Sequence, residues 1–187
     1  QWTWFVPHDP QGLMGLMGGK EQFVERLDEL FTAESKLEGE DVSSDISGLI
    51  GQYAHGNEPV HHVAYLYNFA GYQGRTAEKA DLIMSTLYHT GPEGLSGNED
   101  CGQMSAWYVF SALGFYPVCP GDNRYVLGTP TFDSVTLNLP KNRQAQIVTK
   151  RSGEADIFVQ NVRLNGTDYP QNFITHGDLV EGMKLEF

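Results

Sequence analysis

The stretch "GLSGNEDCGQMSAWYVFSALGFYPV" (94–118) marks the point where the chain changes from helical to strand-like sequence. Its residues 103–113 are mostly apolar, a glycine follows them, and Pro117 prevents a helix from continuing. Apolar residues recur at helical spacing before this point and alternate with polar residues after it. Helices followed by strands are typical of the α+β class. We therefore predict a helical part over 1–118 and a β region over 119–187.

Four segments of the first part have the apolar spacing of helices. They cover residues 20–34, 58–71, 76–89 and 103–114. In the first segment, apolar residues from Phe23 to Phe31 fall on one face and acidic residues on the other. Pro59 occupies a natural first-turn position in the second, and Thr76 is a candidate N-cap of the third.

The second part has short strand-like runs. Residues 133–139 alternate apolar and polar side chains, and 145–150, 156–160, 162–164 and 183–187 are also strand-prone. The dipeptide Asn165-Gly166 is a strong signal for a tight hairpin turn. We expect a small antiparallel β region.

Composition limits the possible partners. The 187 residues have a formal charge of −12, which argues against binding to nucleic acid or to an anionic membrane surface. No apolar run reaches the ~18–20 residues of a membrane span. A helix between Cys101 and Cys119 would hold them too far apart for a disulfide, so we expect free, buried thiols.

Three connections are long for a helical region: 7–19, 36–57 and 90–102. Loops of this length are usually functional. Together with the helices they suggest a slice of an α/α barrel whose loops form a pocket at one end. The aromatic opening "QWTWF" (1–5) suggests a chain that continues a larger protein, and we expect a C-terminal fragment.

The segment "YAHGNEPVHH" (53–62) offers oxygen ligands. The amide of Asn57 and the carboxylate of Glu58 suit a hard cation such as Ca²⁺. The residue types alone favour a simpler interpretation, in which Asn57 caps the following helix and Glu58 interacts with its dipole. Neighbouring His61 and His62 do not readily share one metal ion, so we expect one core histidine and one at the surface or in a pocket.

The segment "GNEDCGQ" (97–103) places Asn98, Glu99 and Asp100 between two glycines. Such a segment suits close approach to a ligand, and capping of the next helix is an equally good interpretation. The apolar helix behind it would partly desolvate a carboxylate and raise its pKa.

The segment "WTWFVPHD" (2–9) combines flat aromatic faces with hydrogen-bonding groups, as sugar sites do. Trp4, His8 and Asp9 are therefore candidate substrate contacts. The alternative is that Phe5 and one tryptophan belong to the core.

Three motifs together resemble the family 92 glycoside hydrolases: "WTWFVPHD" (2–9), "HGNEPVHHVAYLYNFAG" (55–71) and the opening stretch extended to Gly121. The residues from "YVLGTPTFDSVTLNLP" (125–140) onward resemble the end of the same family. Members are calcium-dependent exo-α-mannosidases that invert the anomeric configuration, with a β-sandwich followed by an (α/α)6 barrel. The resemblance implies that this chain holds the last barrel helices and the C-terminal β region.

The resemblance also implies roles for single residues. Asn57, Glu58 and Asp100 would form the Ca²⁺ site, and Asp100 would be the general base. Many members have an aspartate where this chain has Asn98, which leaves Asp100 as the main candidate. Glu99 would be near the substrate or point away from it.

His55 would contact the sugar on the leaving-group side. Some members have an acid after this histidine, associated with α-1,2 linkages, and Gly56 argues against that preference. The family's general acid lies in a segment resembling "EGNAWQ", whose last residue matches Gln1, so we expect this piece alone to lack it.

The resemblance implies a mannose-containing glycan as substrate, the preceding part of the same chain as a partner, and a periplasmic or secreted location. We also expect dimerisation through an exposed barrel face. Two other functions stay open: a carbohydrate-binding or structural accessory module, and an inverting phosphorylase. A phosphorylase needs a basic phosphate site, but Lys20 and Arg75 lie outside the motifs.

Overall fold

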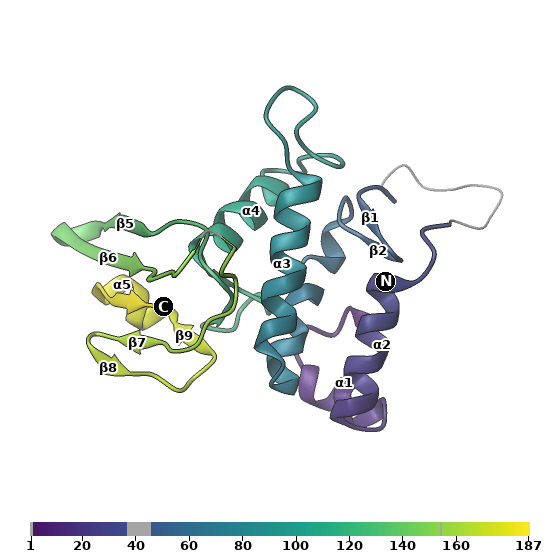
Figure 1. Ribbon diagram of the computed structural model, residues 1–187, viewed down its shortest axis with the longest axis horizontal. Coiled ribbons are helices and arrows are strands. Elements are labelled where there is room, and N and C mark those ends of the chain that lie inside the picture. Colours follow the sequence, from purple (N-terminus) through teal and green to yellow (C-terminus); the bar gives the residue numbers. More distant parts are fainter. Residues whose placement is uncertain (1, 37–45, 154) are drawn as a thin grey trace.

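The computed structural model describes residues 2–36, 46–153 and 155–187. Most helices lie in one half of the molecule and most strands in the other, with α3 (Gln73–Leu87) near the centre (Figure 1). This arrangement confirms the α+β class. Part of the long connection predicted over 36–57 lies outside the described residues.

The first helices fold back on each other near the N-terminus. A short 3-10 turn, η1 (Trp2–Trp4), leads into α1 (Pro10–Leu16), whose N-cap is Asp9, and then α2 (Lys20–Thr32) follows. The predicted apolar face of α2 is confirmed, because Phe23 and Leu27 have no exposed surface.

The prediction of an irregular connection over 7–19 is wrong where α1 forms. The carboxylate of Asp9 accepts a hydrogen bond of 2.8 Å from the backbone N–H of Gly12. Pro10 then occupies the first helical position, where its missing N–H costs nothing.

The segment predicted as one helix over 58–71 forms 3-10 turns instead. These are η2 (Glu58–Val60) and η3 (Val63–Ala70), and Gly71 ends the second with a left-handed φ of 79°. Residues of η3 are buried on nearly all sides, which explains why the segment is apolar throughout.

A short hairpin and the helix α4 position the loops discussed below. The short strands β1 (Leu49–Ile50) and β2 (Tyr53–Ala54) form an antiparallel hairpin before the "GNEP" residues. Helix α4 (Gln103–Leu113) begins after the "GNED" residues and ends at Gly114, as predicted. Thr76 is not the N-cap of α3, because that helix begins at Gln73.

The β half has a five-stranded sheet of order β5-β6-β10-β7-β8. Its strands are β5 (Ser134–Leu139), β6 (Arg143–Val148), β7 (Arg163–Leu164), β8 (Thr167–Asp168) and β10 (Lys184–Glu186). The hairpin predicted at Asn165-Gly166 joins β7 and β8 and is confirmed. The expectation of a purely antiparallel region is wrong, since β10 pairs with β6 in parallel. Residues 156–160, predicted as a strand, pair with no strand among the described residues.

A three-stranded sheet of order β3-β4-β9 connects the halves. It contains β3 (Phe115–Tyr116), which follows α4 directly, with β4 (Arg124–Leu127) and β9 (Phe173–Thr175). A short helix, α5 (His176–Glu181), follows β9 and packs on β6. Phe110 of α4 packs against the hydrophobic cores of both halves, so the two parts share a continuous apolar interior.

Several predictions of burial are wrong. Phe5 is exposed, while Trp4 is the tryptophan of the opening segment that is buried. Cys101 and Cys119 are free, as expected, but the first is exposed and the second half-buried. No helix of the described residues combines the length and apolarity needed to cross a membrane.

Candidate active site

Two glycines bring the "GNEP" segment (56–59) into backbone contact with the "GNED" segment (97–100). A Cβ atom added to Gly97 would lie 2.9 Å from the Cα atom of Gly56 and 3.1 Å from its carbonyl oxygen. A Cβ atom on Gly56 would collide with the backbone carbonyl of Ser96. A larger residue at either position would force the segments apart. The polar residues that follow the two glycines therefore start from neighbouring points of the backbone.

The "GNEP" segment is held by the hairpin before it. Strands β1 and β2 pair with Ile50 opposite Tyr53. The N–H of Gly56 donates to the carbonyl of Ser47 at 3.0 Å, and the Ser47 hydroxyl donates to the carbonyl of Ser96 at 2.6 Å. Ser47 thus ties both segments together.

The "GNED" segment is held by residues at the end of α3. Tyr88 and Leu95 form an isolated β-bridge. The Ser96 hydroxyl donates to the carbonyl of Leu87 at 3.0 Å. These bonds fix the start of the segment on the helical half, at the base of the loop that projects beyond α3 in Figure 1.

The candidate base Asp100 lies in a strained turn directly before α4. Its φ angle is 44° and that of Cys101 is 58°, in the left-handed region that residues other than glycine seldom adopt. The carbonyl of Asp100 accepts from the N–H of Gln103 at 3.2 Å. Such conformations cost ~1–3 kcal/mol each and cluster at functional sites. The Asp100 side chain is exposed, so the expected partial desolvation is absent from this arrangement.

Glu99 interacts with the start of α4. Its carboxylate accepts from the N–H of Ser105 at 2.9 Å and from the hydroxyl of Ser105 at 2.7 Å. These bonds lower the pKa of Glu99. The neighbouring Asn98 is exposed. The three polar residues of the motif therefore differ in environment, and their roles toward a substrate stay predictions.

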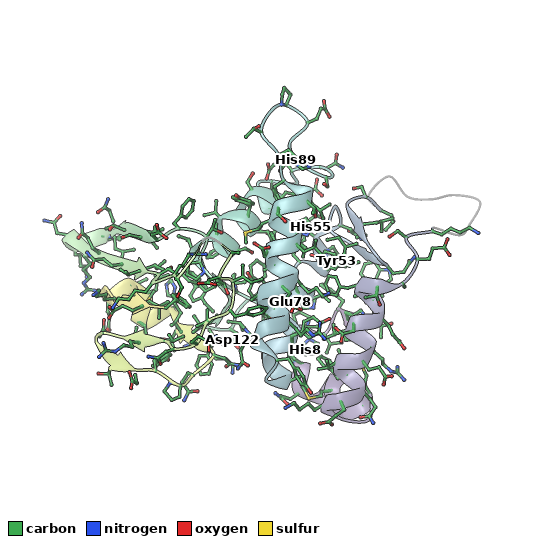
Figure 2. The ribbon with its side chains drawn as sticks, viewed as in Figure 1. His8, Tyr53, His55, Glu78, His89 and Asp122 are labelled. Carbon is green, nitrogen blue, oxygen red and sulfur yellow. The ribbon has the colours of Figure 1, made fainter. Side chains whose placement is uncertain are left out.

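His55, the residue before the "GNEP" segment, is fully buried. Figure 2 shows it near Tyr53. Its Nδ1 lies 2.7 Å from the hydroxyl of Tyr53, and its Nε2 lies 2.6 Å from the hydroxyl of Tyr88. Burial, with a smaller contribution from His61, lowers the pKa of His55 to about 2. Both ring nitrogens are bonded within the chain, so in this arrangement the imidazole offers no polar atom to a sugar.

His61 and His62 are both buried, which contradicts the expectation that one of them is at the surface or in a pocket. Nε2 of His61 lies 2.9 Å from the carbonyl of His55, and Nε2 of His62 lies 2.8 Å from the carbonyl of Trp4. Burial lowers the pKa of His61 to about 4 and also lowers the pKa of His62. Both imidazoles thus serve as neutral donors inside the core.

The three candidates of the opening segment are in different environments. Trp4 is buried edge-on against Phe23, and Asp9 caps α1. His8 is exposed and lines a pocket of about 190 Å³ beside Asp122 and Arg124. That pocket includes none of the polar residues of the "GNEP" and "GNED" segments, and Figure 2 labels His8 well apart from His55 along α3. Contact of these three residues with a substrate stays a prediction.

The oxygen atoms of the "GNEP" segment fit a hard cation. Asn57 and Glu58 are both half-buried, and the side chain of Asn57 makes no capping hydrogen bond to η2, which weakens the capping interpretation. Over the described ranges, no three His, Cys, Asp or Glu side chains form a group that could hold a metal ion. Ca²⁺ takes six to eight oxygen ligands, so this pair would need further ligands from Asp100, water, substrate or other protein segments.

Comparison with known proteins explains why these loops occur together in one chain. The model of the glycosyl hydrolase family 92 catalytic domain matches residues 1–187. The chain belongs to glycosyl hydrolase family 92. The resemblance based on the three motifs is therefore confirmed.

Relatives in family 92 share both sequence and structure with the chain. The family GH92 α-mannosidase BT3965 from Bacteroides thetaiotaomicron is 41% identical with a TM-score of 0.88, and the match covers 100% of this chain. The inverting mannosidase BT2199 from the same species is 40% identical, with a TM-score of 0.84 over 99% of this chain. An uncharacterized secreted glycosidase of Arthroderma benhamiae is 32% identical over 185 residues, or 97% of this chain.

The chain spans about a quarter of the length of these family 92 relatives. The matches cover 24% of BT3965, 26% of BT2199 and 22% of the Arthroderma glycosidase. BT3965 has also been solved in complex with mannoimidazole. These 187 residues therefore align with one portion of each relative.

Three residues of this region were missed by sequence reasoning: Tyr53, Tyr88 and Gln103. The two tyrosines bond His55, and the amide of Gln103 lies 3.1 Å from Nδ1 of His61. Tyr53 lies two residues before His55, so a shared strand face could have been suspected. Nothing local indicates Tyr88, which meets His55 only through the tertiary fold.

Proposed function

We propose that the full-length protein containing this chain is a calcium-dependent, inverting exo-α-mannosidase. The backbone contact between Gly56 and Gly97 carries the proposal, since it joins the "GNEP" and "GNED" segments of a family 92 chain. Its relatives BT3965 and BT2199 are described as mannosidases and support this substrate class. BT2199 is described as an inverting mannosidase, which supports inversion of the anomeric configuration.

Asp100 is proposed as the general base. Inverting hydrolysis needs one carboxylate to activate water and one carboxylic acid to protonate the leaving oxygen, roughly 6.5–9.5 Å apart. The exposed Asp100 carboxylate can reach such a water, while its strained backbone holds it at a fixed point before α4. The exposed amide of Asn98 would hydrogen-bond the same water or a sugar hydroxyl. The general acid is proposed to come from a part of the protein outside these 187 residues.

Asn57 and Glu58 are proposed to hold Ca²⁺ through their amide and carboxylate oxygens. A bound Ca²⁺ would supply a positive charge for the hydroxyl oxygens of a mannose ring. The adjacent η2 turn and the buried core beneath it keep the two side chains close to the "GNED" segment. Location outside the cytoplasm is also proposed, because the Arthroderma relative is described as secreted.

The test measures release of mannose from α-mannosides by the full-length protein. We expect activity that EDTA abolishes and added Ca²⁺ restores. Asp100→Asn should lower kcat by about 10²–10⁴-fold, the usual contribution of a general base, while leaving thermal unfolding unchanged. Asp133→Asn, which changes an exposed carboxylate of the β half, is the matched control and should keep full activity.

Two outcomes would contradict the proposal. Full activity of the chelated protein would contradict the proposed calcium site, and full activity of Asp100→Asn would contradict the role of Asp100 as general base. Binding of mannosides without any hydrolysis would instead favour the accessory-module interpretation.

A further inference from the structure

A series of hydrogen bonds crosses the core beneath the candidate site. The Tyr53 hydroxyl, the His55 imidazole and the Tyr88 hydroxyl are joined at 2.7 and 2.6 Å. The Tyr88 hydroxyl then donates to the carbonyl of Met104 at 2.9 Å. Tyr53, His55 and Met104 have no exposed surface, and Tyr88 is half-buried, so water is largely excluded from the series.

The series has one consistent direction. A tyrosine hydroxyl has a single hydrogen, and that of Tyr88 is used by the carbonyl of Met104. Tyr88 must therefore accept a hydrogen bond from Nε2–H of His55. Nδ1 of the neutral imidazole is then the acceptor for the Tyr53 hydroxyl. Only one tautomer of His55 is compatible with all three hydrogen bonds of the series.

A second set of hydrogen bonds, made by His61, also reaches α4, the helix that contains Met104. Nε2–H of His61 donates to the carbonyl of His55, and Nδ1 of His61 accepts from the amide of Gln103. The indole N–H of Trp107 donates to the carbonyl of His61 at 2.9 Å. The ring centroids of His55 and Trp107 lie 4.5 Å apart at an interplanar angle of 72°, so packing supports the hydrogen bonds.

The two sets of hydrogen bonds connect the segments that bear the candidate chemistry. His55 lies two residues before Asn57, Tyr88 begins the connection that leads to Asp100, and Gln103 opens α4 just after it. None of these bonds lies within a single helix or strand. The arrangement of the two loops therefore depends on these buried side chains as well as on the contact between Gly56 and Gly97.

We propose that His55 and Tyr88 are positioning residues: the hydrogen-bonded series Tyr53–His55–Tyr88–Met104 holds the 57–58 loop in register with the 98–100 loop. This inference rests on the proposed function for its effect on catalysis. Groups that support metal ligands and a base from behind typically change metal affinity or activity by 10–100-fold when altered.

The central variant is Tyr88→Phe in the full-length protein. It keeps the ring but removes the hydroxyl that accepts from His55 and donates to Met104. The matched control is Tyr67→Phe, which removes the hydroxyl of another buried tyrosine whose partner is Asp28 of α2. Tyr88→Phe loses two hydrogen bonds and Tyr67→Phe loses one, but only Tyr88 bonds a residue next to the candidate site.

Three measurements are compared between the variants. We expect Tyr88→Phe to weaken Ca²⁺ binding by about tenfold in calorimetric titration and to lower kcat by at least tenfold at saturating Ca²⁺, with a smaller change in KM. Hydrogen exchange of the peptides covering 55–60 and 96–102 should become faster together. Tyr67→Phe should change none of these three quantities. The melting temperature should fall in both variants.

A second pair of variants separates positioning from folding. His55→Gln keeps an N–H that can reach Tyr88, whereas His55→Leu keeps none. We expect the glutamine to restore part of the Ca²⁺ affinity and slow exchange of the loops that the leucine loses. Equal behaviour of the two variants, or unchanged loop exchange in Tyr88→Phe, would overturn the inference.

The failure of the proposed function would look different. A wild-type protein without Ca²⁺ binding or mannosidase activity would contradict that function, while coupled exchange of the two loops in Tyr88→Phe would still support the positioning series. An active, Ca²⁺-dependent wild type with indifferent Tyr88→Phe and His55→Leu would contradict the series alone.

Discussion

The residues that shape the candidate site are those with the fewest conformational choices. Asp100 and Cys101 have left-handed φ angles, and Gly102, with a φ of 87°, continues the same turn into α4. A chain would not retain two non-glycine residues there unless surrounding contacts compensated for the cost. The hydrogen bonds of Glu99 with Ser105 and of Asp100 with Gln103 are such contacts.

The glycine contact gives a prediction at this scale. Gly97→Ala places a methyl group 2.9 Å from the Cα atom of Gly56, a distance that real Cβ atoms do not adopt. The loops must separate, so we expect at least a tenfold loss of Ca²⁺ affinity and of kcat/KM in the full-length protein. Titration calorimetry and mannoside hydrolysis measure the two effects.

The control for this variant is Gly15→Ala in α1, where an added Cβ atom has no neighbour within 4 Å. It should keep both properties and stabilise the helix by about 0.5–1 kcal/mol. Wild-type affinity and activity in Gly97→Ala would show that the contact is dispensable.

Among the elements, the 3-10 turns over 58–70 differ most from their sequence pattern. The apolar residues of this segment predict a helix, but their spacing does not reveal that His61 and His62 bond carbonyls of His55 and Trp4. The bond of His62 joins the segment to the distant start of the chain, and the bond of His61 joins it to the residue that follows β2. Neither bond belongs to a helical pattern, and together they can override the local preference. An apolar, wholly buried segment has no polar face from which its helical type could be inferred.

The buried histidines predict how stability depends on pH. Burial lowers the pKa of His61 to about 4 and lowers that of His62, so the folded chain binds protons at these imidazoles less readily than the unfolded chain, which binds them below about pH 6.5. Their stabilising effect is therefore complete above pH 6.5 and is lost as pH falls. Between about pH 6.5 and its folded pKa of about 4, His61 should contribute about 1.4 kcal/mol of lost stability per pH unit, and His62 should add a loss of the same sign.

Urea unfolding in EDTA between pH 7.5 and pH 5 measures this dependence without a contribution from metal binding. His61→Gln should make the slope shallower by the share of one histidine. A free energy of unfolding that stays constant over this range would show that the imidazoles are accessible to protons in the folded state.

Sequence predicted some elements better than others, for reasons that differ from place to place. The amphipathic face of α2, the end of α4 at Gly114 and the Asn165-Gly166 hairpin depend on local signals, and all three are confirmed. Helix α1 also has a local signal, the cap Asp9 followed by Pro10, which was overlooked among glycines. The parallel pairing of β10 with β6 has none, since it joins residues almost forty positions apart.

The candidate site likewise contains residues that the sequence indicates and residues that it does not. Asn57, Glu58 and Asp100 are visible in the sequence as oxygen-bearing residues beside apolar segments, but their types also suit helix capping. Their expected roles come from the resemblance of the motifs to family 92. Tyr88 and Gln103 were not found because a tyrosine at a helix end and a glutamine at a helix start are ordinary. Their significance arises only where the fold brings them to His55 and His61.

At the scale of the whole molecule, the two halves share an interior but leave large apolar side chains uncovered. Phe110 joins the two cores, whereas Trp2 is 71% exposed and Leu16 is 89% exposed. Val109 on α4 is 55% exposed as well. Exposed apolar side chains indicate contact with another protein surface when they gather in one patch.

We expect the isolated 187-residue chain to associate through these residues. Light scattering should give about twice the 20.8 kDa mass of one chain at micromolar concentration. Replacing Leu16 with glutamate should shift the mass toward one chain, because a charge on the contact surface opposes burial. A single-chain mass for the wild type at every concentration would contradict this expectation.

Gly56 has a consequence for attempts to redesign the specificity of the protein. Any side chain there meets the hydroxyl of Ser47 and the backbone carbonyl of Ser96, which belong to two other loops. Introducing an acid at position 56 to favour a different linkage therefore also requires changes in the loops that contain Ser47 and Ser96. The Ser47 hydroxyl can be removed by substitution, whereas the Ser96 carbonyl belongs to the backbone and must move with its loop. A library that varies position 47 together with the residues around 96 should therefore succeed where single replacements at position 56 do not.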